Sequence, residues 1–168
     1  SLPTITARPG YTAKWMYTNS ENAKVEFTTE TVVPEAGLTV EAVYTAIEYN
    51  VNIPTETIAH VTIRADKTKA TVEDKVEFTV TIEEGYTADV KVNGTKVTLT
   101  NGKYVYTMEA GDVTLTVENV AAIERVVTYV NGEEEIPSAN VTVETGYKVS
   151  SLPTITARPG YTAKWMYT

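Results

Sequence analysis

The chain has 168 residues and a formal net charge of −8. Because acidic surfaces repel nucleic acid and anionic membranes, we expect no nucleic-acid partner and no direct membrane contact. The absence of cysteine excludes disulfides and thiol chemistry. Thr and Val are abundant, and there are 11 Tyr against 2 Phe, a composition that favours strands. The predicted fold class is therefore mostly β.

The most informative feature is a repeat. Residues 1–18, SLPTITARPGYTAKWMYT, recur unchanged as residues 151–168, so residue 151 restarts a period of 150 residues. We expect the chain to hold one period of a tandem array and the start of the next copy. Modules in such arrays mainly contact their neighbours, and their usual role is to set length, spacing and multivalency.

The first module is predicted to comprise residues 1–57. After the repeated segment, a long β-rich stretch runs from residue 37 to residue 53. Pro54 and the polar run at residues 55–57 then interrupt it, which indicates a module boundary.

A second module is predicted over residues 58–121. Its expected strands are residues 60–65, 75–82, 88–92, 96–100, 103–108 and 113–120. Two of the turns contain Asn-Gly, at Asn93 and Asn101, which is typical of hairpin turns with positive φ at both central residues. Short antiparallel strands at this spacing predict a small β-sandwich or meander.

The third segment, residues 122–168, restarts with an expected strand at residues 125–132 and leads through residues 141–153 into the second copy of the repeat. The two expected connectors, residues 53–59 and 119–123, are short and lack Gly/Ser runs. We therefore predict that neighbouring modules hold a fixed relative orientation.

Three sequence motifs resemble those of a known family. These are VVTYVNG at residues 126–132, Gly-Tyr-x-Val-x-x-Leu-Pro at residues 146–153, and Pro-Gly-Tyr-Thr followed by Trp and Tyr at residues 159–167. With LTVEAVY at residues 38–44 as the closing strand, this cyclic unit resembles the internalin-type B-repeat, or Listeria-Bacteroides repeat, family, although Lys164 stands where the family has a glycine.

The resemblance implies a β-grasp-like fold that is split across the two chain ends. Residues 1–57 would then be the C-terminal portion of one B-repeat-like module, and residues 122–168 the N-terminal portion of the next. The central module is similar to bacterial Ig-like surface domains. Both resemblances imply an extracellular protein, on a bacterial cell surface or secreted.

The sequence contains few residues in patterns typical of enzymes. His60 is the only histidine, and the sequence has neither a nucleophile elbow nor a glycine-rich phosphate loop before a helix. The carboxylate runs lack the ligand spacing of a calcium loop. We therefore expect no enzyme activity, no catalytic or metal-binding residues and no cofactor.

The repeated segment contains an aromatic face. Strand alternation places its tyrosines and tryptophan on one side, where they form either the core of a small module or a platform that stacks on sugars. The candidate ligand face comprises Tyr11, Trp15, Tyr17, Tyr161, Trp165 and Tyr167. We predict that each tryptophan is buried wherever its copy completes a B-repeat-like module.

A covalent cross-link is a further candidate. Surface β modules sometimes join a lysine to an asparagine through an isopeptide bond beside a buried acidic residue. Lys69 or Lys75 early in the central module and Asn119 late in it stand at suitable positions in the sequence.

The predicted function is a structural stalk or fibre segment of a bacterial adhesin-like protein. The alternative is a carbohydrate- or protein-binding module with a host or cell-surface partner. The expected partners in the first case are neighbouring copies, head to tail. The two half-modules either close within one chain or pair between chains, and we expect an end-to-end fibre in which residues 125–131 join a sheet containing residues 38–49 of a neighbour.

Overall fold

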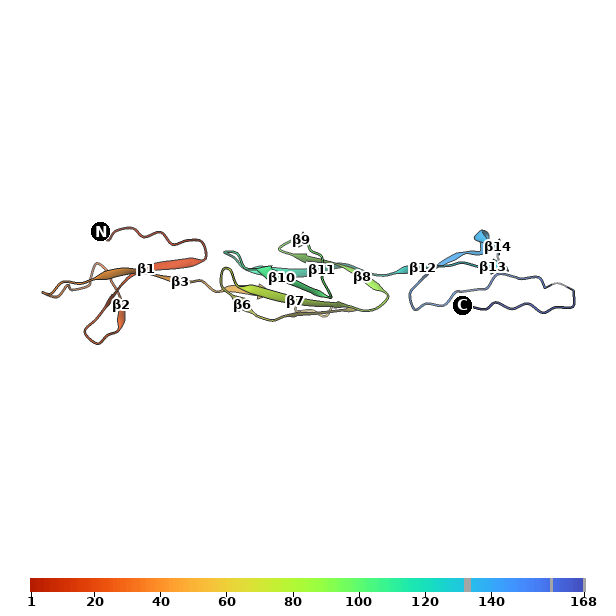
Figure 1. The fold of residues 1–168 in the computed structure, drawn as a ribbon, viewed down its shortest axis with the longest axis horizontal. Helices are drawn as coiled ribbons and strands as arrows, with labels where there is room; N and C mark the ends of the chain where they lie inside the picture. Colours follow the sequence, from red (N-terminus) through yellow and green to blue (C-terminus); the bar gives the residue numbers. More distant parts are fainter. Residues whose placement is uncertain (132–133, 158, 168) are drawn as a thin grey trace.

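The structure is a computed structural model that describes residues 1–131, 134–157 and 159–167. The described residues form fifteen strands and one 3-10 turn, with no α-helix. The mostly β class is confirmed. The strands group into three parts that follow one another along an elongated molecule (Figure 1).

The N-terminal part is a three-stranded antiparallel sheet in the order β2-β1-β3. Its strands are β1 (Tyr11–Thr18), β2 (Lys24–Glu26) and β3 (Val40–Ala46). The register of β1 and β3 runs from Tyr11 opposite Ala46 to Tyr17 opposite Val40. Strand β3 is an edge strand, so one of its sides is not paired within this sheet.

The central part consists of two sheets. Its strands are β4 (Tyr49–Asn52), β5 (Val61–Ala65), β6 (Lys69–Ala70), β7 (Lys75–Ile82), β8 (Tyr86–Val92), β9 (Thr95–Lys96), β10 (Lys103–Thr107) and β11 (Val113–Ala122). One sheet has the order β10-β7-β5 and the other the order β6-β4-β11-β8-β9. The only parallel pair in the described sheets joins β4 to β11, with Val51 opposite Val113.

One hydrophobic core lies between these two sheets. Alternate residues of β7 point inward, so Val76, Phe78 and Val80 are buried while the residues between them are not. The facing sheet contributes the buried side chains Val51, Ala70, Val90, Val92, Val113 and Leu115 to the same cluster. Period-two patterning is what places these residues on one face.

The Asn-Gly turns of the central part are confirmed. Asn93 and Gly94 have φ of 48° and 77°, and Asn101 and Gly102 have φ of 51° and 75°. Positive φ at both positions matches the right-handed twist of the flanking strands. The strand expected at residues 96–100 is shorter in the structure, where it is confined to β9.

The first module boundary differs from the expectation. Residues 37–53 do not form one strand, because β3 ends at Ala46 and β4 pairs with β6 and β11 of the central sheet. The expected connector at residues 53–59 therefore lies between two strands of the central part. The chain passes from the N-terminal to the central part at Ile47 and Glu48.

The C-terminal part is built on a hairpin of β12 (Glu124–Val127) and β15 (Val141–Glu144). Between these strands lie β13 (Val130–Asn131), β14 (Glu134–Glu135) and the 3-10 turn η1 (Pro137–Ala139). The second copy of the repeat comes next, and its residues 161–167 form no strand although their sequence is that of β1. Gly132, the last residue of the strand expected at residues 125–132, and Glu133 lie outside the described residues.

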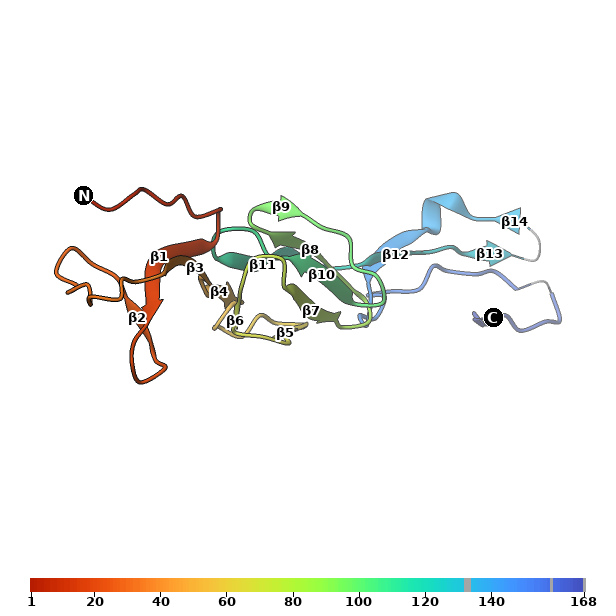
Figure 2. The same ribbon diagram turned by 60° about the vertical axis from the view of Figure 1, so that its left-hand side comes forward.

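The two ends of the described chain do not meet. Figures 1 and 2 both show the N-terminal and C-terminal parts on opposite sides of the central part. The predicted split module is therefore not closed within the described residues.

The core of the central part yields a stability prediction. Phe78 is fully buried, so Phe78→Ala should lower the free energy of unfolding by about 3–5 kcal/mol through lost transfer energy and cavity formation. Urea unfolding followed by far-UV circular dichroism measures this change. The matched control is Val105→Ala on β10, where the side chain is 51% exposed and a change within about 0.5 kcal/mol is expected. Equal losses for the two variants would contradict the assigned core.

Candidate functional site

The first junction between parts depends on a glycine backbone. Directly beyond the Tyr11–Ala46 pair, the Ile47 amide donates to the Gly10 carbonyl at 2.8 Å. Gly10 is buried and has φ of 82°, and a Cβ added there would lie 2.0 Å from Val72 Cγ2 of the central part. Only glycine therefore permits the observed contact between these two parts.

The second junction repeats this arrangement. Beyond the Tyr86–Ala122 pair, the Ile123 amide donates to the Gly85 carbonyl at 2.7 Å. Gly85 has φ of 88°, and an added Cβ would lie 2.5 Å from Thr145 Cγ2 of the C-terminal part. The Thr145 amide and hydroxyl both donate to the Ile123 carbonyl, at 3.0 Å and 2.8 Å.

The two junctions share their sequence as well as their geometry. Gly-Tyr-Thr-Ala occurs at residues 10–13 and 85–88, and Ala-Ile-Glu at residues 46–48 and 122–124. In each case the strand that follows the glycine pairs with the strand whose last residue is the alanine of Ala-Ile-Glu. These short repeats are visible in the sequence, but sequence reasoning missed them because their significance lies in the pairing of distant segments.

The expected connector at residues 119–123 is shorter in the structure. Residues 119–122 belong to β11, so Ile123 alone separates β11 from β12. With two residues at the first junction and one at the second, the backbone has little freedom between parts.

Two aspartates hold the central side of the first junction. The Asp74 carboxylate accepts hydrogen bonds from the Thr71 amide at 2.9 Å and the Thr71 hydroxyl at 3.1 Å, which closes the turn that carries Val72. The Asp112 carboxylate accepts from the Asn50 amide at 2.7 Å and the Asn50 side chain at 3.1 Å, which holds β4 beside β11. These bonds lower the pKa of both carboxyl groups: through Thr71 for Asp74, and mainly through the Asn50 side chain for Asp112.

The lowered pKa values predict acid sensitivity at this junction. A carboxyl group whose folded-state pKa is depressed contributes stability above its unfolded pKa, about 3.9, and loses it as the pH falls through the folded value. The melting temperature should therefore decrease as the pH is lowered below about 4. Asp74→Asn and Asp112→Asn should flatten this acid limb in melts from neutral pH to about pH 2, whereas Glu56→Gln, at an exposed loop position, should leave it unchanged. An unchanged acid limb in both aspartate variants would contradict the assignment.

The aromatic face of the repeat differs between the two copies. In β1, Tyr11, Trp15 and Tyr17 are half-buried and Thr12 and Lys14 are exposed, but Met16 is half-buried too, so the alternation holds from Tyr11 to Trp15 only. In the second copy Tyr161 is 75% and Tyr167 99% exposed. Trp165 is half-buried. The burial of each tryptophan in a complete B-repeat-like module stays a prediction.

The local loop of the repeat is nevertheless the same in both copies. The Trp15 indole N–H donates to the Pro3 carbonyl at 2.8 Å, and the Trp165 indole N–H donates to the Pro153 carbonyl at 2.8 Å. The repeated sequence therefore specifies this loop by itself. The two copies differ in the neighbouring segments that they contact.

Trp165 packs edge-on against Tyr129, with ring centroids 5.0 Å apart. Tyr129 is 5% exposed, and its hydroxyl has no hydrogen-bond partner among the described residues. A buried hydroxyl that stays unpaired costs about 1–3 kcal/mol. Beside these rings lies a groove of about 610 Å³ whose lining includes Val130, Leu152 and Met166.

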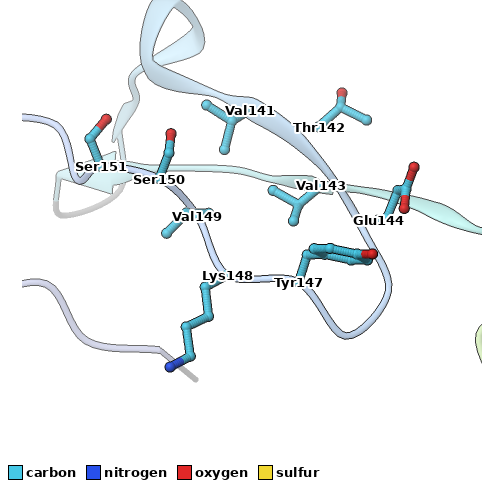
Figure 3. A pocket seen from close by; sticks show the side chains of 9 residues that line it. All are labelled: Val141, Thr142, Val143, Glu144, Tyr147, Lys148, Val149, Ser150 and Ser151. Atoms are coloured by element: carbon cyan, nitrogen blue, oxygen red, sulfur yellow. The ribbon is translucent and has the colours of Figure 1, made fainter.

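A second groove, of about 630 Å³, runs between β15 and the segment that returns from it. Figure 3 shows Val143 and Tyr147 on the inner side of this turn and Lys148 pointing away from it. Its lining is valines, small polar residues, one tyrosine, Glu144 and Lys148.

Asn119 forms no hydrogen bond to Lys69 or Lys75, the candidates for the cross-link, among the described residues. The side chain that meets Asn119 is Asp89, whose carboxylate accepts from the Asn119 amide group at 2.9 Å. The lysine bound to Asp89 is Lys96, whereas Lys69 lies on β6 and Lys75 on β7. Hydrogen bonds from Lys96 and then Asn119 lower the pKa of Asp89. Its side chain is 29% exposed, so Asp89 is not the buried acid that an isopeptide site needs.

His60 lies beside the second junction. Its ring stacks on Tyr86 with centroids 3.7 Å apart, and its Nδ1 lies 2.6 Å from Glu83 Oε2. Within the described ranges, no group of three or more His, Cys, Asp or Glu side chains is placed to hold a metal ion. A helix long and apolar enough to cross a membrane is likewise not found among the described residues.

Comparisons with known proteins return no relative. No protein-family profile, no curated protein and no solved structure matches the chain.

Proposed function

We propose that this chain is a spacer segment of a bacterial surface or secreted adhesin-like protein, in which repeated β modules set length and spacing. The observation that carries the proposal is the equivalence of the two junctions. Both press a glycine backbone against a β-branched side chain of the next part and bond the glycine carbonyl to the isoleucine after the pairing strand. A chain that joins its successive parts through the same glycine contact can be lengthened by adding further parts.

The finer architecture belongs to the same proposal. The N-terminal part is the C-terminal portion of one B-repeat-like module with a β-grasp-like fold, the C-terminal part is the N-terminal portion of the next, and the central part is an Ig-like sandwich. The parallel pairing of the first central strand, β4, with the last, β11, and the two facing sheets support the second assignment. The identical loops around Trp15 and Trp165 support the first.

Solution scattering of the intact chain tests the spacer function. The parent chain should give the pair-distance distribution of an elongated particle. Gly10→Ala and Gly85→Ala should loosen their junctions, because the new Cβ would lie 2.0 Å from Val72 and 2.5 Å from Thr145, and should broaden that distribution. Gly37→Ala is the matched control, since Gly37 also has positive φ, 77°, but has nothing within 4 Å of an added Cβ.

A broad range of shapes for the parent chain would overturn the spacer proposal. So would junction variants that scatter like the parent, because the glycine contacts would then not determine the orientation of the parts.

The alternative is a binding module that uses the Tyr/Trp face, and the exposure of Tyr161 and Tyr167 favours it. In the first copy the equivalent residues, Tyr11 and Tyr17, lie in a strand that is paired within a sheet. A spacer should therefore bind no sugar through these tyrosines. We expect no binding to a glycan array by the intact chain. Binding that Tyr161→Ala and Tyr167→Ala abolish, while Tyr44→Ala on β3 does not, would favour the binding module instead.

A further inference from the structure

The side of each junction that receives the glycine is built on a hairpin, and the two hairpins have the same register. At the first junction, β4 and β6 pair with Tyr49 opposite Ala70. At the second junction, β12 and β15 pair with Arg125 opposite Val143. Tyr49 and Arg125 are each the second residue after the junction isoleucine. Ala70 and Val143 each stand two residues before the side chain that contacts the glycine, so both hairpins place that side chain in the same way.

The turns that follow these hairpins also match. The residue after the contacting side chain has positive φ in both, 73° at Glu73 and 86° at Gly146. One backbone hydrogen bond of 3.1 Å closes each turn. The two bonds run from the Asp74 amide to the Thr71 carbonyl and from the Tyr147 amide to the Glu144 carbonyl. Because positive φ is uncommon outside glycine, its occurrence at Glu73 indicates that the two turns share one backbone conformation.

The glycine sides of the junctions match over three strands. Strand β1 pairs with β3 from Tyr11 opposite Ala46, and β8 pairs with β11 from Tyr86 opposite Ala122. A third strand, β2 or β9, lies on the other side of β1 or β8, and its pairing starts at the sixth residue after the glycine in both. The N-terminal part therefore repeats the order β9-β8-β11 of the central sheet.

The central sheet contains both of these units side by side. Its order β6-β4-β11-β8-β9 joins the hairpin to the three-stranded unit through the parallel pair of β4 and β11. The C-terminal part holds the same hairpin as β15-β12, and the N-terminal part holds the same three-stranded unit as β3-β1-β2. What the described terminal parts lack is the parallel pair, and its two strands would be β12 and β3.

We propose that residues 123–150, the repeat and residues 19–46 of the following period form a second module with the strand pairing of the central part. Strand β12 pairs in parallel with β3 of that following period, in a sheet of order β15-β12-β3-β1-β2. This assignment rests on the proposed spacer function, because only in an array does a copy of residues 19–46 come after the second copy of the repeat. One period then holds two modules of one pairing scheme, joined at Ile47 and at Ile123.

The central sheet also gives the register of the new pair. Asn52 lies opposite Thr114, and its side chain donates to the Thr114 hydroxyl at 3.4 Å. Asn52 and Thr128 are each the fifth residue after the junction isoleucine. Thr114 and Thr39 each stand one residue before the partner of the seventh residue after the glycine. Thr128 is therefore assigned opposite Thr39.

The apolar pattern of the unit agrees with this register. On β11, Val113 and Leu115 are fully buried in the core between the two central sheets. The equivalent positions before and at the start of β3 are Leu38 and Val40, which are half-buried while Thr39 between them is exposed. The alternation that forms one side of the central core is thus present in the strand assigned to β12.

Hydrogen exchange of a lengthened chain tests the pairing. A chain in which a copy of residues 19–46 is added after residue 168 contains every strand of the second module. The amides of β12 that face its free edge should then exchange about tenfold more slowly, or slower still, than in the 168-residue chain, because they acquire carbonyl acceptors. Unchanged exchange in β12 would overturn the proposal.

Two variants of the added copy provide the matched comparison. Leu38→Asn places a polar side chain at the position of the fully buried Val113 and should return the exchange of β12 to the rate in the 168-residue chain. Thr39→Asn, at the adjacent exposed position, should leave the exchange slow. Equal exchange rates in the two variants would contradict the assigned pairing.

Cysteine cross-linking tests the register, since the chain has no native cysteine. In the lengthened chain, Thr128→Cys and Thr39→Cys of the added copy should form a disulfide, because opposite residues of neighbouring strands lie about 4.8 Å apart. The control places the second cysteine at Thr45 of the added copy, an exposed position near the other end of β3. Equal yields would refute the register. Scattering of the lengthened chain reports on the spacer function separately, because an elongated particle is expected whether or not β12 pairs with β3.

Discussion

The close approach of a glycine backbone to the next part is the constraint on which the rest of the structure depends. At Gly10 and Gly85 a side chain would overlap Val72 and Thr145, so these positions need both positive φ and the absence of a Cβ. The glycine carbonyl also accepts a bond from the residue that leaves the paired strand. One residue therefore sets the start of a strand, the end of its partner and the orientation of the next part.

The two copies of the repeat separate local from non-local determinants of structure. The indole–proline hydrogen bond forms in both copies, so the sequence of the repeat is sufficient for that loop. The strand forms only in the first copy, where β2 and β3 supply partners. Strand structure thus depends on pairing, and the same residues can be strand or irregular according to whether partner strands come after them in the chain.

The same distinction explains how far the sequence predicted the fold and the candidate site. Most central strands, their Asn-Gly turns and the aromatic face of β1 were predicted, because alternation and turn chemistry are local signals. The first boundary was placed too late because apolar alternation continues through Ile47 and Glu48, although β3 and β4 belong to different sheets. The pairing of β4 with β11 and the contact of Asn119 with Asp89 were not predicted, because each depends on the register of distant strands. The glycine junctions were visible as two short repeats, but their role required knowing which segments pair.

The charge of the surface limits what can hold successive copies together. Exposed cross-strand pairs such as Lys14–Glu26 and Lys103–Glu77 contribute little, because solvent screens them and ordering long side chains costs entropy. The net charge of −8 adds a repulsion between neighbouring chains. In the proposed array, contact between successive copies would therefore depend on backbone pairing and on burial of apolar side chains rather than on charge. Both are short-range interactions that form only in one register, so they select the correct neighbour where charge alone would select none.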